Sequence, residues 1–178
     1  MKQTDKVALG GVLGALSLVC MLLTIIPTAT YALPAIAGVV LMPLVVEWGA
    51  RFGFTVFAAV GVLALIMSPD KEAALLFVAF FGHYPIVKAL LEKHIRQRPI
   101  RWVLKFTVFN ACVIAAYALL VWLFAFPMDE FELFGISAMW LILLCGNVVF
   151  WLYDIALKRV ITMYVCRLRT HLMRIVRK

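Results

Sequence analysis

The basic residues of this chain gather at alternate breaks between six apolar segments, and this pattern limits the fold more than any other feature. All but one of the 17 Lys and Arg residues lie at or near one set of breaks, and the exception is Lys71. Asp70, Glu72 and the acidic residues of 129–132 lie at the other set. Basic residues are retained on the cytoplasmic side of a membrane. We therefore predict an all-α integral membrane protein with six transmembrane helices and both termini cytoplasmic.

The composition also indicates a multi-pass protein of the cell membrane. Charged residues make up 15% of the chain, against about 25% in a soluble domain. So few charges would not cover a water-exposed globule. The net charge is +8, but the cations flank apolar segments and do not form one soluble face. We therefore expect anionic lipids as partners, and no nucleic acid.

The spacing of the breaks gives the helices their expected bounds, because about 20 apolar residues cross a hydrocarbon core. The predicted spans are 7–26, 34–48, 52–67, 73–91, 102–126 and 133–157. Pro85 falls inside the fourth span and should kink it. Residues 1–157 would form the transmembrane domain. Residues 158–178 would form a basic amphipathic helix that lies on the inner leaflet or continues the sixth span, as a membrane anchor or as a docking site for a cytoplasmic partner.

Small residues form two adjoining strips on the first predicted helix. Gly10 and Gly14 make one strip, and Gly11 and Ala15 make the other. Small residues at this spacing let a second helix approach closely within a membrane. Two interpretations stay open: the strips pack against other helices of the same chain, or they dock an external helical partner.

Polar residues concentrate in the half of the predicted bundle that carries the acidic breaks. Polar groups inside a membrane are costly and usually face a cavity or one another. Mutual or backbone hydrogen bonds would explain the polar residues within the helices, and a solvated turn with a helix cap would explain 70–72. The alternative is a solute site, with aromatic walls. The candidate substrate-binding residues are Tyr31, Asp70, Lys71, Glu72, His83, Tyr84, Asn110, Trp140 and Asn147.

Near the other end of the sixth span, Asp154 precedes Lys158 by four residues. This is the preferred order for an ion pair on one helix face, so we expect a structural pair. The chain contains no P-loop, HExxH or GxSxG motif, and its four cysteines form no CxxC pair. We therefore predict that the protein is not an enzyme and that it has no catalytic residues, no metal site and no cofactor of its own.

The chain resembles the substrate-binding (S) components of energy-coupling factor (ECF) transporters. The resemblance rests on size, six predicted helices with both ends inside, and the small-residue sequence ALGGVLGA at 8–15. In that family an Ala-xxx-Ala face on the first helix docks onto a transmembrane scaffold subunit, which two separate ATPases drive. The outer loops and helix ends form the vitamin or metal site. Here Gly-xxx-Gly and Gly-xxx-Ala stand in place of Ala-xxx-Ala.

The resemblance implies a subunit for uptake of a vitamin-like solute into a bacterial cell. Gly10, Gly11, Gly14 and Ala15 would dock the scaffold subunit, and the two partner ATPases would use the ATP. Two other functions stay open. One is a membrane assembly or scaffold protein without a small ligand. The other is a proton-coupled secondary transporter working through His83 or Asp70, although the sequence shows no internal repeat.

Overall fold

The computed structural model describes residues 3–26, 29–124, 132–133 and 136–168. For residue 117 and for residues 119–142, side chains are not described. This part of the chain is helical, apart from a short antiparallel pairing of β1 (Glu132–Leu133) with β2 (Ile136–Ser137). Among the described residues, four helical segments are long and apolar enough to cross a membrane: Gln3–Ile25, Ala50–Met67, Lys71–His94 and Arg98–Ala116. The helical, membrane-embedded class is thus supported, and the six-span count stays a prediction.

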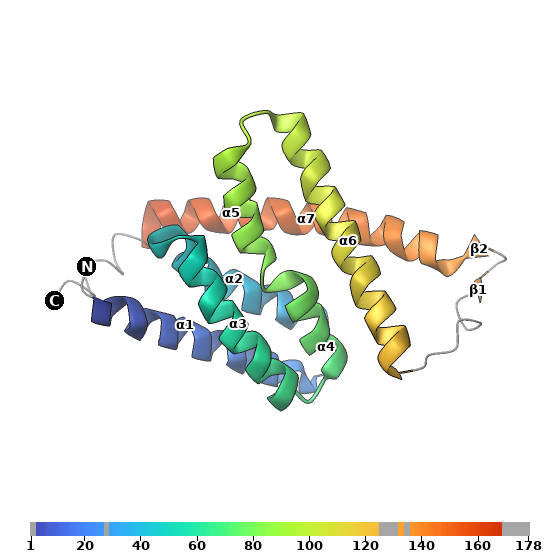
Figure 1. The fold of residues 1–178 in the computed structure, drawn as a ribbon, viewed down its shortest axis with the longest axis horizontal. Helices are drawn as coiled ribbons and strands as arrows, with labels where there is room; N and C mark the ends of the chain where they lie inside the picture. The colour runs from blue at the N-terminus through green and yellow to red at the C-terminus, as the bar shows by residue number, and fades with distance from the viewer. Residues whose placement is uncertain (1–2, 27–28, 125–131, 134–135, 169–178) are drawn as a thin grey trace.

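The first three helices pack against one another as a compact unit (Figure 1). They are α1 (Gln3–Leu22), which continues as the short helix η1 (Leu23–Ile25), α2 (Ala32–Trp48) and α3 (Ala50–Met67). Gly49 alone separates α2 from α3, and its φ of 85° is a conformation that glycine adopts without steric strain. The chain therefore reverses direction there within one residue. Met21, Leu41 and Phe57 are among the side chains buried in this unit.

The fourth predicted helix is interrupted. It consists of α4 (Lys71–Leu76), the π-helical segment η3 (Phe77–Phe81) and α5 (Tyr84–His94). Pro85 has no amide hydrogen to donate to the carbonyl of Phe81, so an α-helix cannot continue regularly through this point. The amide of Gly82 instead donates to the carbonyl of Phe77 at 2.8 Å. The kink expected at Pro85 is thus a break at residues 82–83, just before the proline.

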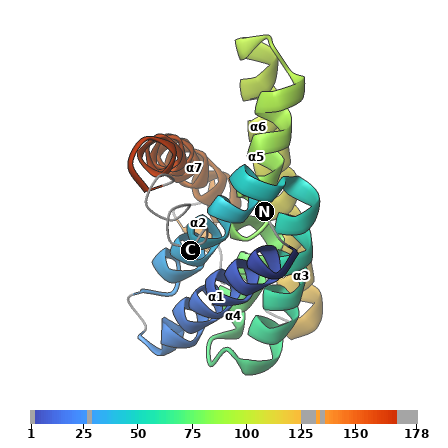
Figure 2. The same ribbon diagram turned by 90° about the vertical axis from the view of Figure 1, so that its left-hand side faces the viewer.

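The remaining helices are α6 (Arg98–Phe124) and α7 (Ala138–Met163), which continues as the π-helical segment η5 (Tyr164–Leu168). The α5–α6 hairpin projects from the unit formed by α1, α2 and α3 (Figures 1 and 2). Phe80, Phe109 and Phe150 bring η3, α6 and α7 together in a second buried cluster. α7 passes residue 157 without a break. The division at 157/158 stays a prediction, because residues 169–178 lie outside the described ranges.

Basic and acidic turns lie in different parts of the molecule. The start of α1, the α2–α3 junction and the end of α7 lie at the left of Figure 1, the α5–α6 turn lies at the top, and the α3–α4 turn lies at the bottom. Lys6, Arg51 and Lys158 belong to the segments at the left, and Asp70 and Glu72 belong to the α3–α4 turn. The orientation of these segments relative to a membrane, and with it the side that faces the cytoplasm, stays a prediction.

Candidate functional site

A buried charge cluster joins α5, α6 and α7, and we define it as Tyr84, Lys88, Glu92, Lys105 and Asp154. The Asp154 carboxylate is its centre. Lys105 Nζ donates to Asp154 Oδ1 and Oδ2 at 3.0 and 3.1 Å, and the Tyr84 hydroxyl donates to Oδ1 at 2.6 Å. Lys88 Nζ donates to the same Oδ1 and, at 3.0 Å, to the backbone carbonyl of Asp154. Three donors from two other helices thus surround one carboxylate.

The charges of the cluster balance. Glu92, which lies at its edge, accepts from Lys105 Nζ at 2.8 Å and lies 3.6 Å from Lys88 Nζ. The side chains of Lys88, Lys105 and Asp154 are at most 5% exposed, while that of Glu92 is 35% exposed. Ionised groups within membrane-spanning helices are costly unless they are paired, so two ammonium groups opposite two carboxylates are the favourable composition. The arrangement can hold three helices in register, and it can also bind or exchange a charged group.

Helical spacing places the α5 members of the cluster on one face, because Tyr84, Lys88 and Glu92 follow one another at intervals of four. Our expectation of an Asp154–Lys158 pair was wrong. Asp154 is buried and faces α5 and α6, whereas Lys158 is exposed. One sequence signal could have revealed the cluster. Lys88 lies within an apolar segment, and an ionisable residue in a membrane helix is a candidate functional residue in its own right.

The candidate residues near the acidic turns have structural partners. One pair joins two turns, and two residues cap helix ends. The Tyr31 hydroxyl donates to Glu72 Oε1 at 3.1 Å, which joins the start of α2 to α4. Asp70 caps α4 by accepting from the amide of Ala73 at 3.1 Å. Lys71 Nζ donates at 3.0 and 3.1 Å to two carbonyls at the end of α3. Partial burial, together with the charge of Glu72, raises the pKa of the Tyr31 phenol.

The candidate residues within the helices form two separate groups. Asn110 and Asn147 exchange two hydrogen bonds, each 3.1 Å long, between α6 and α7. His83 has other partners: its Nδ1 is 3.2 Å from the Val78 carbonyl oxygen and its Nε2 is 3.7 Å from Cys112 Sγ. Tyr84 belongs to the charge cluster, and the side chain of Trp140 lies outside the description. The sequence left open whether the polar residues within the helices bond to one another or line a solute site. The two asparagines bond to each other.

The two small-residue strips of α1 have different surroundings. An added Cβ would lie 2.8 Å from Phe52 Cζ at Gly10 and 3.2 Å from Val56 Cγ1 at Gly14, so this strip packs tightly against α3. At Gly11 an added Cβ would meet no atom within 4 Å, and Ala15 is exposed. Internal packing therefore accounts for the first strip, while the second strip faces away from the described helices.

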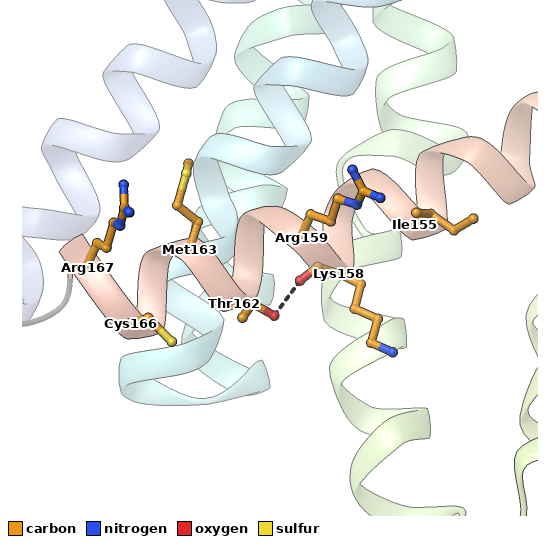
Figure 3. A pocket seen from close by; sticks show the side chains of 7 residues that line it. All are labelled: Ile155, Lys158, Arg159, Thr162, Met163, Cys166 and Arg167. Carbon is orange, nitrogen blue, oxygen red and sulfur yellow. Dashed lines mark hydrogen bonds between the residues drawn. The ribbon is translucent and has the colours of Figure 1, made fainter.

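The surface of the described residues includes two shallow hollows of about 620 Å³ each. One follows α6 from Trp102 to Ile114 and includes Asn110. The other follows the end of α7 and η5, between Ile155 and Arg167 (Figure 3). Neither hollow is lined by His83 or Asn147. Within the described ranges, no group of three or more His, Cys, Asp or Glu side chains is arranged to hold a metal ion.

No protein-family model, curated protein or solved structure matches this chain. The resemblance to ECF S components therefore rests on the sequence features given above.

Proposed function

We propose that the chain is the membrane-embedded, solute-binding subunit of an uptake transporter whose energy comes from separate subunits, as in the ECF transporters. The observation that carries the proposal is the division of the small residues on α1. Gly10 and Gly14 are covered by α3, but Gly11 and Ala15 face outward with open space at Gly11. A helix that needs small residues only for internal packing has no use for the second strip. In this proposal, a transmembrane scaffold subunit packs closely against α1 at this second strip.

The solute would be captured at the opposite end of the molecule from the start of α1. Support comes from the hydrogen bond between Tyr31 and Glu72, which joins the turn before α2 to the acidic α3–α4 turn. A small vitamin-like solute would bind by replacing part of this polar contact. In this proposal the charge cluster keeps α5, α6 and α7 aligned while the solute is bound.

The proposal is tested by purifying the tagged full-length protein from membranes of its native host. The wild type should bring down a transmembrane scaffold subunit and two ATPases. The double variant Gly11→Leu/Ala15→Leu should lose them, because leucine would hold the partner helix away. Val12→Leu is the matched control, since Val12 is exposed on the same helix outside the strip. A wild-type preparation without scaffold or ATPase would contradict the proposal.

A second candidate function is a membrane assembly protein without a small ligand. The observation in its favour is that Asn110 and Asn147 are hydrogen-bonded to each other, and that Asp70 caps α4. Mass spectrometry of small molecules retained after gentle purification separates the two candidates. A retained vitamin-like compound supports the uptake subunit. Protein partners other than ATPases, without any retained compound, support the assembly protein. Uptake that survives inactive ATPases but stops without a proton gradient would favour a proton-coupled transporter.

A further inference from the structure

The outward-facing side chains of α7 change character along the helix. Leu144, Val148 and Leu152 are exposed and apolar. One to two turns further along the chain, Lys158 and Arg159 are exposed and basic. In a membrane-embedded helix, such a change marks the level at which acyl chains give way to lipid headgroups.

The opposite face of the same segment is fixed by packing. Leu157 is fully buried, and Asp154 belongs to the charge cluster. Tyr164 is also buried, and its hydroxyl lies 3.5 Å from Glu47 Oε1 on α2. These contacts set the rotation of α7 about its axis. Lys158 and Arg159 are therefore directed away from the bundle by the fold itself.

The outward face is hollowed, basic and partly apolar (Figure 3). Arg159, Met163 and Arg167 point to one side of the helix, while Lys158, Thr162 and Cys166 point to the other. The Thr162 hydroxyl donates to the Lys158 carbonyl at 2.9 Å, so its proton is engaged within the helix. Among the described residues, no Asp or Glu lines the hollow, which is formed by Ile155, Lys158, Arg159, Thr162, Met163, Cys166 and Arg167.

We propose that this surface, which we call the basic face, binds the headgroup of an acidic phospholipid. Lys158 and Arg159 flank the hollow from its two sides, and each can form charge-assisted hydrogen bonds with the oxygens of a headgroup that lies between them. Ile155 and Met163 lie in the same hollow and contact the glycerol and the upper acyl chain. The absence of acidic residues from the lining favours an anionic occupant. This inference does not depend on the proposed uptake role.

The test is native mass spectrometry of the full-length protein in detergent, titrated with phosphatidylglycerol or with phosphatidylcholine. The wild type should bind phosphatidylglycerol more tightly. Lys158→Gln/Arg159→Gln should weaken that binding about fivefold for each cation removed, as expected for basic residues at an anionic lipid surface. Arg96→Gln/Arg98→Gln is the matched control, because it removes the same charge from exposed positions at the α5–α6 turn. It should weaken the binding clearly less.

Equal losses in the two double variants would overturn the proposal, because they would show diffuse attraction to the whole basic end. Equal binding of the two lipids would overturn it as well. Displacement of phosphatidylglycerol by inorganic phosphate alone would assign a free-anion site in place of a lipid site. Lys158→Arg/Arg159→Lys keeps both charges and should retain the lipid, which separates a loss of charge from a loss of folding.

Discussion

The ammonium group of Lys88 on α5 donates to the carboxylate of Asp154 on α7, although the two residues lie 66 positions apart in the sequence. Lys105 on α6 donates to the same carboxylate from a third helix. One buried carboxylate therefore links three helices. Removing it would leave two ammonium groups in an apolar setting, opposite a single half-exposed Glu92.

Asp154→Asn should destabilise the protein by about 3–5 kcal/mol, as found when one partner of a buried ion pair is removed. The free energy of unfolding can be followed by chemical denaturation in detergent micelles. Glu92→Gln is the comparison, because Glu92 lies at the edge of the cluster and is partly solvated. Its effect should be clearly smaller than that of Asp154→Asn.

Lys88→Met should partly rescue Asp154→Asn. The single variant leaves two cations opposite one carboxylate, whereas the double variant leaves Lys105 opposite Glu92, which restores the charge balance. The double variant should therefore be more stable than the sum of the single effects predicts, and a double-mutant cycle measures the difference. Additive effects would show that the two residues act independently.

Gly38→Ala should destabilise the protein by about 1–3 kcal/mol through overpacking. An added Cβ at Gly38 would lie 2.1 Å from the carbonyl oxygen of Phe81, which is the oxygen that Pro85 leaves without its α-helical donor. Because a backbone atom cannot yield as a side chain does, α2 and η3 would have to separate. Thermal unfolding in detergent measures the loss.

Gly11→Ala is the matched control for Gly38→Ala. Open space surrounds Gly11, and alanine favours a helix over glycine by about 1 kcal/mol, so this variant should be unchanged or slightly more stable. If both glycine variants lost the same stability, the close approach of α2 to η3 would not be the cause.

Asn110→Ala and Asn147→Ala should each lower the free energy of unfolding by about 1 kcal/mol, the range measured for hydrogen bonds between membrane helices. Each single variant leaves the amide oxygen of the other asparagine without its partner. The double variant should thus lose less than the two single effects combined. Solute binding measured on the same variants would show whether the pair has a second role, because a structural pair should leave the solute affinity unchanged.

Glu72→Gln should lower the pKa of the Tyr31 phenol toward its ordinary value, because it removes the carboxylate charge beside the hydroxyl. With the pKa raised in the folded protein, the contribution of the contact to stability is complete at neutral pH and is lost as the pH rises through the folded-state pKa. Ultraviolet absorbance titration measures the shift, with Tyr31→Phe identifying the signal of this residue. An unchanged titration in Glu72→Gln would show that burial alone raises the pKa.

Features that depend on neighbouring residues could be predicted from the sequence. Pro85 interrupts its helix because proline lacks an amide hydrogen, and this property is local. Asp70 caps α4 for a similar reason, since it directly precedes the helix and its carboxylate reaches the amide of Ala73. The sequence did not predict that the carbonyl of Phe81, beside this break, packs closely against Gly38 of α2.

Features that depend on distant residues could not be predicted in the same way. The sequence offered Lys158 as the partner of Asp154, because four residues separate them on one helix. The fold buries Asp154 against Lys88 and Lys105 and leaves Lys158 exposed. The two strips on α1 were likewise equivalent in sequence. Only the position of α3 distinguishes Gly10 and Gly14 from Gly11 and Ala15.

By itself, the sequence determined that this protein is helical and membrane-embedded, and it separated basic from acidic segments. Hydropathy and charge act through the surrounding lipid and water, so their effect can be calculated from composition and spacing alone. The tertiary structure decided which ionised groups are paired and which small residues remain outward-facing. These outcomes depend on which helix faces come together, because a buried charge is stabilised only by a partner within a few ångströms. That partner can lie anywhere in the chain, as Lys88 does for Asp154.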